Sequence, residues 1–148
     1  MDVQKIRRFN RYYARILGIF DKKFLGMDFS VTEVRIIGEI GRNPKLTAKD
    51  LGSYLSVDKG YMSRMLQNLE KQGLICRKKS EKDAREKHLR LTEEGERLNN
   101  ILEEKADQRI LRQIQGMDGE AFRALLDAME KIEEIMGQPV EEEEQGGN

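Results

Sequence analysis

The fold is decided by residues 48–66, which read AKDLGSYLSVDKGYMSRML. Leu51 and Leu55 are four residues apart, and this spacing places both on one face of a short helix. Ser56 is small enough for a tight turn after that helix. Asp58 is a good N-cap for a following helix, because its carboxylate can accept hydrogen bonds from the free N–H groups of the first turn. Two short helices joined in this way predict a helix-turn-helix.

The second helix of this motif has one apolar face and one hydrogen-bonding face. Its apolar residues, Met62, Met65, Leu66 and Leu69, recur at helical spacing. The other positions are donors or small residues with one aromatic ring and no acid, namely Lys59, Gly60, Tyr61, Ser63, Arg64, Gln67 and Asn68. Such side chains suit contacts with base edges and phosphates in a major groove. The alternative is an ordinary helical hairpin with a solvated face.

A basic hairpin is predicted directly after the motif. Residues 74–79 begin with β-compatible side chains, residues 87–91 alternate polar and apolar, and the polar residues 80–86 lie between them. Residues 77–90 contain seven Lys or Arg and three acids, a net charge of +4. Beside a helix-turn-helix, such a wing is placed to contact the phosphate backbone or the minor groove. The candidate contacts are Arg77, Lys79, Asp83, Arg85 and Lys87, and a merely solvated hairpin is the alternative.

Both ends of the chain predict long amphipathic helices. Residues 3–25 carry a broad apolar stripe, which includes Phe20, and residues after Thr92 continue an apolar stripe at mostly four-residue steps. Ser30 and Glu33 form a capping box between the first helix and the motif. The predicted fold is therefore mainly α with a small β wing, a winged helix-turn-helix dimerised through its N- and C-terminal helices. The predicted divisions are a dimerisation helix at 1–28, a DNA-binding domain at 29–91, dimerisation helices at 92–138 and an acidic disordered tail at 139–148.

Composition argues against several other classes of protein. The chain has 148 residues and a formal net charge of zero. Zero net charge is compatible with binding of nucleic acid here, because positive charge is gathered locally in the wing. Cys76 and His88 are the only cysteine and histidine, so a metal site would have to rest on carboxylates alone, and no Ser-His-Asp set can be assembled. We therefore expect no enzyme, no cofactor and no metal. No apolar run suits a membrane span or a signal peptide, and a cytoplasmic protein with no membrane partner is expected.

Five short pieces of sequence follow one another at a recognisable spacing. They are Leu51-Gly52-x-x-Leu55, Asp58-Lys59-x-x-Met62-Ser63-Arg64, Leu69-Glu70-Lys71-Gln72-Gly73-Leu74-Ile75-x-Arg77, Asp83-x-Arg85 and Leu91-Thr92-x-x-Gly95. Together they resemble the MarR family of winged helix-turn-helix transcription regulators, and the likeness covers about residues 3–136.

The resemblance implies a homodimer that binds double-stranded DNA at a palindromic operator. It also implies repression that is usually relieved by a small-molecule inducer or by cysteine oxidation. Ser63 and Arg64 would contact phosphate and bases, and Arg85 would enter the minor groove. Asp83 would orient a wing arginine by a charge-assisted hydrogen bond. Cys76 does not match the position of the family's reactive cysteine, and we interpret it as a buried hydrophobic residue.

Two questions stay open at the level of sequence. Phe9, Tyr12, Tyr13 and Arg15 could line a ligand pocket, or their rings could form part of the dimer core. The chain could also be a winged-helix protein-interaction module that has lost DNA binding. Such a module should expose apolar side chains on its reading surface and should lack the wing arginines. This chain keeps the wing arginines.

Overall fold

The helix-turn-helix predicted from residues 48–66 is formed by α3 (Ala48–Leu55) and α4 (Lys59–Lys71). A computed structural model of the chain describes residues 1–19 and 21–137. The other elements are α1 (Val3–Leu17), a 3-10 turn η1 (Phe24–Gly26), α2 (Val31–Arg42), β1 (Ile75–Lys79), β2 (Lys87–Leu91), α5 (Glu93–Gln113) and α6 (Gly119–Met136). The fold is therefore mainly helical with a two-stranded wing, as the sequence predicts.

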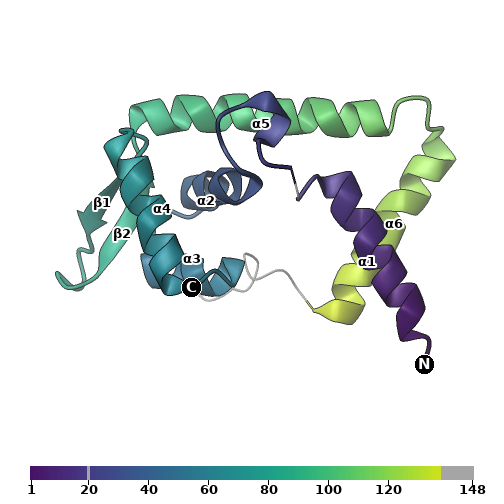
Figure 1. Cartoon of the computed structure of the whole chain (residues 1–148), viewed down its shortest axis with the longest axis horizontal. Coiled ribbons are helices and arrows are strands. Elements are labelled where there is room, and N and C mark those ends of the chain that lie inside the picture. The colour runs from purple at the N-terminus through teal and green to yellow at the C-terminus, as the bar shows by residue number, and fades with distance from the viewer. Residues whose placement is uncertain (20, 138–148) are drawn as a thin grey trace. The chain divides into compact units, whose positions relative to one another are not determined.

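The chain divides into two units, Met1–Lys105 and Ala106–Asn148, and α5 runs through the division. The first unit contains α2, the helix-turn-helix and the wing, and the second contains the end of α5 and all of α6. In the first unit, the β1–β2 ribbon extends away from α2 and α4 to a free tip (Figure 1). The acidic segment 139–148 and Phe20 lie outside the described residues.

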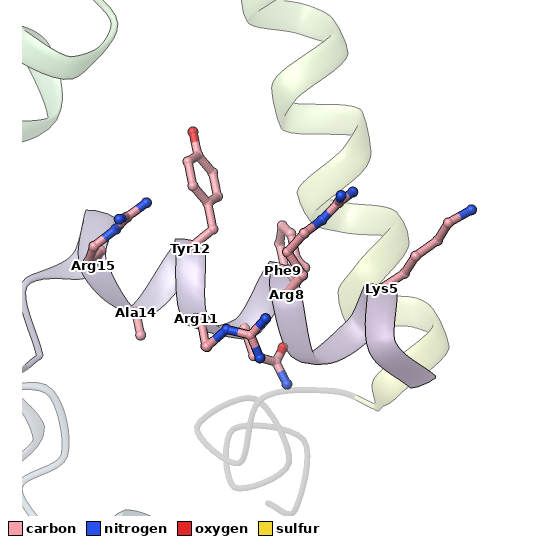
Figure 2. A pocket seen from close by; sticks show the side chains of 8 residues that line it. Lys5, Arg8, Phe9, Arg11, Tyr12, Ala14 and Arg15 are labelled. Carbon is pink, nitrogen blue, oxygen red and sulfur yellow. The ribbon is translucent and has the colours of Figure 1, made fainter. Parts of the chain in front are cut away.

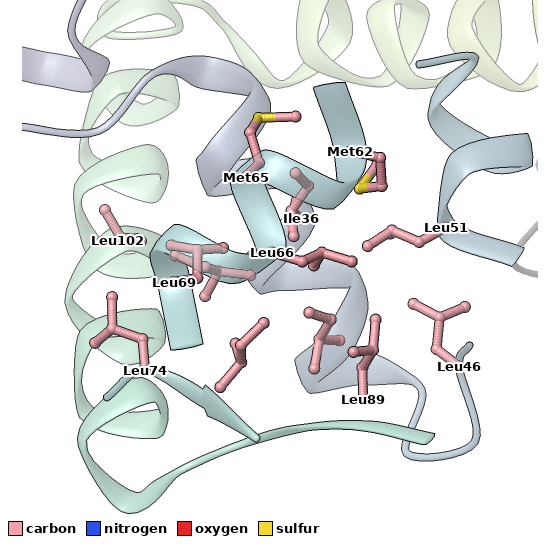
Figure 3. Packing of buried hydrophobic residues seen from close by; sticks show 13 residues of the cluster. Ile36, Leu46, Leu51, Met62, Met65, Leu66, Leu69, Leu74, Leu89 and Leu102 are labelled. Atoms are coloured by element: carbon pink, nitrogen blue, oxygen red, sulfur yellow. The ribbon is translucent and has the colours of Figure 1, made fainter. Parts of the chain in front are cut away.

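One apolar cluster holds α2, α3, α4 and the wing together. Leu66 and Leu69 of α4 are fully buried in this cluster, and Leu102 of α5 also packs into it (Figure 3). The four buried residues of α4 are the four apolar positions predicted from its sequence. The complete set is Ile36, Ile37, Ile40, Leu46, Leu51, Met62, Met65, Leu66, Leu69, Leu74, Ile75, Leu89 and Leu102. This burial fixes which face of α4 remains outward.

The helices of the first unit begin at the residues that the sequence indicates. Ser30 Oγ accepts from Glu33 N at 3.1 Å, and Glu33 Oε1 accepts from Ser30 N at 3.1 Å. Thr47 and Asp50 form the same reciprocal pair at the start of α3. These bonds satisfy N–H groups that the first turn of a helix leaves without intrahelical partners.

The first helix is shorter than predicted. We expected it to cover residues 3–25, but α1 ends at Leu17, and Gly18 adopts the left-handed conformation with φ 68°. Phe24 lies instead in the 3-10 turn, where its N–H donates to Phe29 O at 2.6 Å. Phe24, Met27 and Phe29 are partly buried against the core. The apolar stripe therefore continues past Gly18 because a turn, rather than a helix, packs those side chains.

The junction between wing and α5 depends on Thr92 and Gly95. Thr92 Oγ1 donates to Gly73 O at 2.6 Å and accepts from Gly95 N at 3.0 Å, while Thr92 N donates to Leu74 O at 3.0 Å. A Cβ at Gly95 would lie 2.0 Å from Leu74 O, far inside van der Waals contact. The spacing Thr92-x-x-Gly95 therefore combines a helix cap with a close approach of two backbones.

Candidate nucleic-acid interface

The turn between α3 and α4 presents one face of α4 to solvent. Ser56 closes α3 in the left-handed region at φ 50°, and Asp58 Oδ2 accepts from Tyr61 N at 3.2 Å at the start of α4. All seven residues proposed to read DNA are exposed: Lys59, Gly60, Tyr61, Ser63, Arg64, Gln67 and Asn68. They form a surface rich in hydrogen-bond donors that contains no carboxylate.

Gly60 lies beside the Asp58 carboxylate and the Arg64 guanidinium at the start of α4. A Cβ at Gly60 would lie 3.2 Å from Asp58 Oδ2 and 3.5 Å from Arg64 Nη1. The guanidinium of Arg64 therefore lies back over the first turn of α4, close to the capping carboxylate. A side chain at Gly60 would crowd the Asp58 carboxylate, and Gly60 itself stays a predicted DNA contact.

The register of the wing separates its cations onto two faces. Residues directly opposite each other in an antiparallel pair share a face, and the pairs are Ile75↔Leu91, Arg77↔Leu89 and Lys79↔Lys87. Ile75 and Leu89 are buried, so this face of the wing packs on the rest of the first unit. Arg77, Lys79 and Lys87, the three strand cations predicted to contact DNA, all belong to it, whereas Cys76, Lys78, His88 and Arg90 belong to the other face.

The wing tip is held by hydrogen bonds within residues 80–86. Ser80 N donates to Glu86 O at 2.9 Å, Glu86 N donates to Asp83 O at 3.1 Å, and Lys82 N donates to Ser80 Oγ at 3.2 Å. Asp83 Oδ1 accepts from the backbone N–H of Arg85 at 2.9 Å. The family resemblance implies that Asp83 orients an arginine. In the structure its carboxylate acts on the backbone of Arg85, and this bond shapes the turn.

Most of the candidate cations have no internal partner. Within residues 1–19 and 21–137, Lys59, Arg64, Lys79, Arg85 and Lys87 make no ion pair. Arg77 differs, because its Nε donates to Glu70 Oε1 of α4 at 2.9 Å. Sequence reasoning missed Glu70, since nothing in a spacing of seven residues indicates a contact between a helix and the following strand.

A hollow of about 680 Å³ lies between α3 and α4 on the same side. Its walls include Lys49, Lys59, Ser63 and Arg77. Lys49 is exposed and was not among the predicted contacts. The sequence shows only that Lys49 is the second residue of α3, and this position does not distinguish a DNA-contacting lysine from any other surface lysine.

The predicted ligand-binding residues of α1 are only partly brought together. Phe9, Tyr12 and Arg15 line an open hollow along α1 (Figure 2). Tyr13 is not part of that lining, but its ring stacks on Phe9 with 5.6 Å between ring centroids and 12° between ring planes. Residues of α1 are exposed or half-exposed, with Phe9 at 44% and Tyr12 at 54%.

Other chemistry is not assembled in the described part of the chain. No group of three or more His, Cys, Asp or Glu side chains there could hold a metal ion. Cys76 is a free, partly buried thiol, and His88 Nε2 lies 3.9 Å from Glu86 Oε2. None of the described helices is long and apolar enough to cross a lipid bilayer.

A capped α3–turn–α4 pair followed by a basic antiparallel ribbon defines a winged helix-turn-helix protein. Residues 26–86 match a family model described as the MarR family. Over these residues the chain is therefore similar to the MarR family of winged helix-turn-helix transcription regulators.

Individual relatives agree with this placement. The organic hydroperoxide resistance transcriptional regulator of Bacillus subtilis is 46% identical over 61 residues, which are 41% of this chain and 39% of that protein. The transcriptional regulator PetP of Rhodobacter capsulatus is 35% identical over 105 residues, which are 69% of this chain and 63% of that protein. This chain therefore spans less than two thirds of the length of these curated relatives.

Solved structures share the fold over most of the chain. Streptococcus pneumoniae FabT in complex with DNA superposes with a TM-score of 0.73 at 27% identity, covering 91% of this chain and 97% of that chain. The apo form of E. coli MarR superposes with a TM-score of 0.69 at 20% identity, covering 87% and 94% of the two chains.

Proposed function

We propose that the protein is a transcriptional repressor that binds a palindromic operator as a homodimer. Residues 29–91 read the DNA, residues 1–28 and 92–138 form the dimer, and a small ligand releases the operator. The observation that carries the proposal is the set of cations without an ion-pair partner, together with hydrogen-bond donors, on α4 and the wing; residues 59–68 of α4 contain no carboxylate. FabT, which shares this fold, was solved in complex with DNA.

The roles of the proposed contacts follow from their positions. Ser63, Arg64, Gln67 and Asn68 lie along α4 and face base edges and phosphates in the major groove. Lys79 and Lys87 lie on the α4 side of the wing and contact phosphates. Arg85, at the tip, enters the minor groove, where a flat cation suits the electronegative floor.

The main competing function is a winged-helix module that binds protein. Such a module needs an apolar reading surface, and Tyr61 is the one large apolar side chain exposed on α4 within the described residues. Most of the other exposed apolar residues lie on α1, α5 and α6. This distribution favours DNA on the wing side and a second copy of the chain on the terminal helices.

The proposed inducer would occupy the hollow along α1. The rings of Phe9 and Tyr12 offer an apolar wall, and Arg15 offers a cation for an acidic group. Tyr13 would act indirectly, by fixing the ring of Phe9. Tyr12→Ala separates the two interpretations of this region, because a dimer-core residue changes the molecular mass in solution and a ligand-pocket residue does not.

Footprinting across a salt series on DNA upstream of the protein's own gene tests the proposal. A protected site with dyad symmetry, with affinity falling steeply as salt rises, is the expected result. Weak, salt-sensitive binding to any duplex would place the operator elsewhere in the genome. Failure to bind any duplex at low salt would favour the protein-interaction module.

Arg85→Ala should weaken operator binding about tenfold and reduce the salt dependence by about 0.9 in the slope of log affinity against log salt. Its side chain has no internal partner in the described residues, so its loss should leave the fold intact. Fluorescence anisotropy with a labelled operator measures both quantities. Glu120→Ala, an exposed change on α6, should alter neither, and equal effects of the two variants would place the DNA on another surface.

A further inference from the structure

Arg77 lies against the recognition helix instead of projecting freely from the wing. Its Nε donates to Glu70 Oε1 at 2.9 Å, and only 31% of the Arg77 side chain and 36% of the Glu70 side chain are exposed. The register puts Arg77 opposite the buried Leu89, on the face of the ribbon that packs on the first unit. This is the one ion pair, among the described residues, that joins α4 to the wing.

Glu70 occupies a position that an isolated helix disfavours. It lies in the last turn of α4, next to the final residue Lys71. Carboxylates are unfavourable at the C-terminal end of a helix, where the exposed carbonyl groups carry partial negative charge. The guanidinium of Arg77 offsets this repulsion and gives the carboxylate a partner.

The Arg77 side chain also reaches toward the DNA-reading part of α4. It lines the hollow between α3 and α4 together with Ser63 and Lys59. Ser63 and Glu70 are seven residues apart, about two helical turns, and so lie on one side of the helix. Arg77 therefore lies along α4 between the level of Glu70 and the level of the predicted phosphate contacts.

We propose that Glu70 is a positioning residue, which holds Arg77 and so fixes the wing against the recognition helix as one rigid reading surface. The inference rests on the proposed DNA-binding function. Arg77 then acts through the ion pair, and not as an independent phosphate contact as the basic charge of the wing predicts. Lys79 follows Arg77 by two residues on the same strand face, so the ion pair also sets where the remaining wing cations lie relative to Arg64.

Three variants test the proposal: Glu70→Gln, Arg77→Gln and the double variant. The DNA probes are the footprinted operator duplex and an unrelated duplex of equal length and base composition. Each single variant should bind the operator about five- to tenfold more weakly and the unrelated duplex within about twofold of wild type. The double variant should be no weaker than the worse single variant, because one interaction is removed in all three.

A charge-matched control is Glu81→Gln. Glu81 is exposed near the wing tip and, in the described part of the chain, has no ion-pair partner. Removing its charge should strengthen binding to both duplexes slightly and equally. The proposal is overturned if Glu70→Gln behaves like this control, or if Arg77→Gln weakens both duplexes equally and lowers the salt slope by about 0.9, as loss of a phosphate contact would.

A measurement without DNA separates this inference from the proposed function. Backbone amides of β1 should exchange with deuterium faster in Glu70→Gln and Arg77→Gln, by the same factor in both and in the double variant, and unchanged in Glu81→Gln. If the β1 amides exchange faster by the same factor in all three variants but the protein binds no duplex, the DNA-binding proposal is refuted and the positioning of the wing by Glu70 stays supported. Unchanged exchange would overturn the positioning role whatever the DNA result.

Discussion

Gly95→Ala should destabilise the protein by about 3 kcal/mol, at the upper end of the usual cost of overpacking a filled interior. The added Cβ would lie 2.0 Å from Leu74 O. That carbonyl cannot move away freely, because it already accepts the N–H of Thr92 at 3.0 Å. Either α5 or the base of the wing must shift. Urea unfolding followed by circular dichroism measures the change in the free energy of unfolding.

Gly119→Ala is the matched control, because a Cβ at Gly119 meets nothing within 4 Å. It occupies the first residue of α6, and alanine there should be neutral within about 0.5 kcal/mol or slightly stabilising. If Gly95→Ala costs as little as Gly119→Ala, then α5 moves easily relative to the wing, and the close approach at Leu74 is not a constraint on the fold.

Leu126→Glu should dissociate the proposed homodimer and reduce operator affinity by roughly 100-fold or more, because the second half-site then no longer binds at a high effective concentration. No residue of α6 is buried within its own chain, and Leu126 is 44% exposed. Its exposed apolar residues are Phe122, Leu126, Met129, Ile132, Ile135 and Met136. Monomeric proteins rarely expose an apolar stripe of this extent. Sedimentation equilibrium gives the mass, and anisotropy gives the affinity.

Glu120→Gln is the control for the dimer, since it removes a charge from α6 outside that apolar stripe. It should leave both the mass and the operator affinity unchanged. A Leu126→Glu protein that still sediments as a dimer would exclude α6 from the interface, and the α1 face that contains Ile6 and Phe9 would then be the next to test.

Local signals in the sequence predicted most of the first unit. Ser30, Thr47 and Asp58 each accept a backbone N–H in the first turn of a helix, as their side-chain chemistry indicates. The apolar spacing in α4 identified its buried residues without error. These features are determined by neighbours within four residues, so they can be read from the chain alone.

Features that depend on distant partners were not predictable in the same way. The apolar pattern of residues 3–25 continued past Gly18 because periodicity records burial of side chains, and a turn can bury Phe24 as well as a helix can. The Arg77–Glu70 ion pair and the contact of Gly95 with Leu74 depend on how the wing packs on the helices. The predicted DNA contacts themselves remain predictions, because their test requires the operator.

The four hydrogen bonds within residues 80–86 mean that the loop carrying Arg85 is shaped before it meets DNA. Ordering a slack loop on binding would cost about 1–2 kcal/mol per residue in backbone entropy. A loop that is already folded avoids most of that loss, so in the proposed complex Arg85 would enter and leave a groove without refolding of the loop. The proposed regulator would then sample many non-operator sites quickly, and the time spent at each site would depend on how well the groove fits Arg85 rather than on folding of the loop.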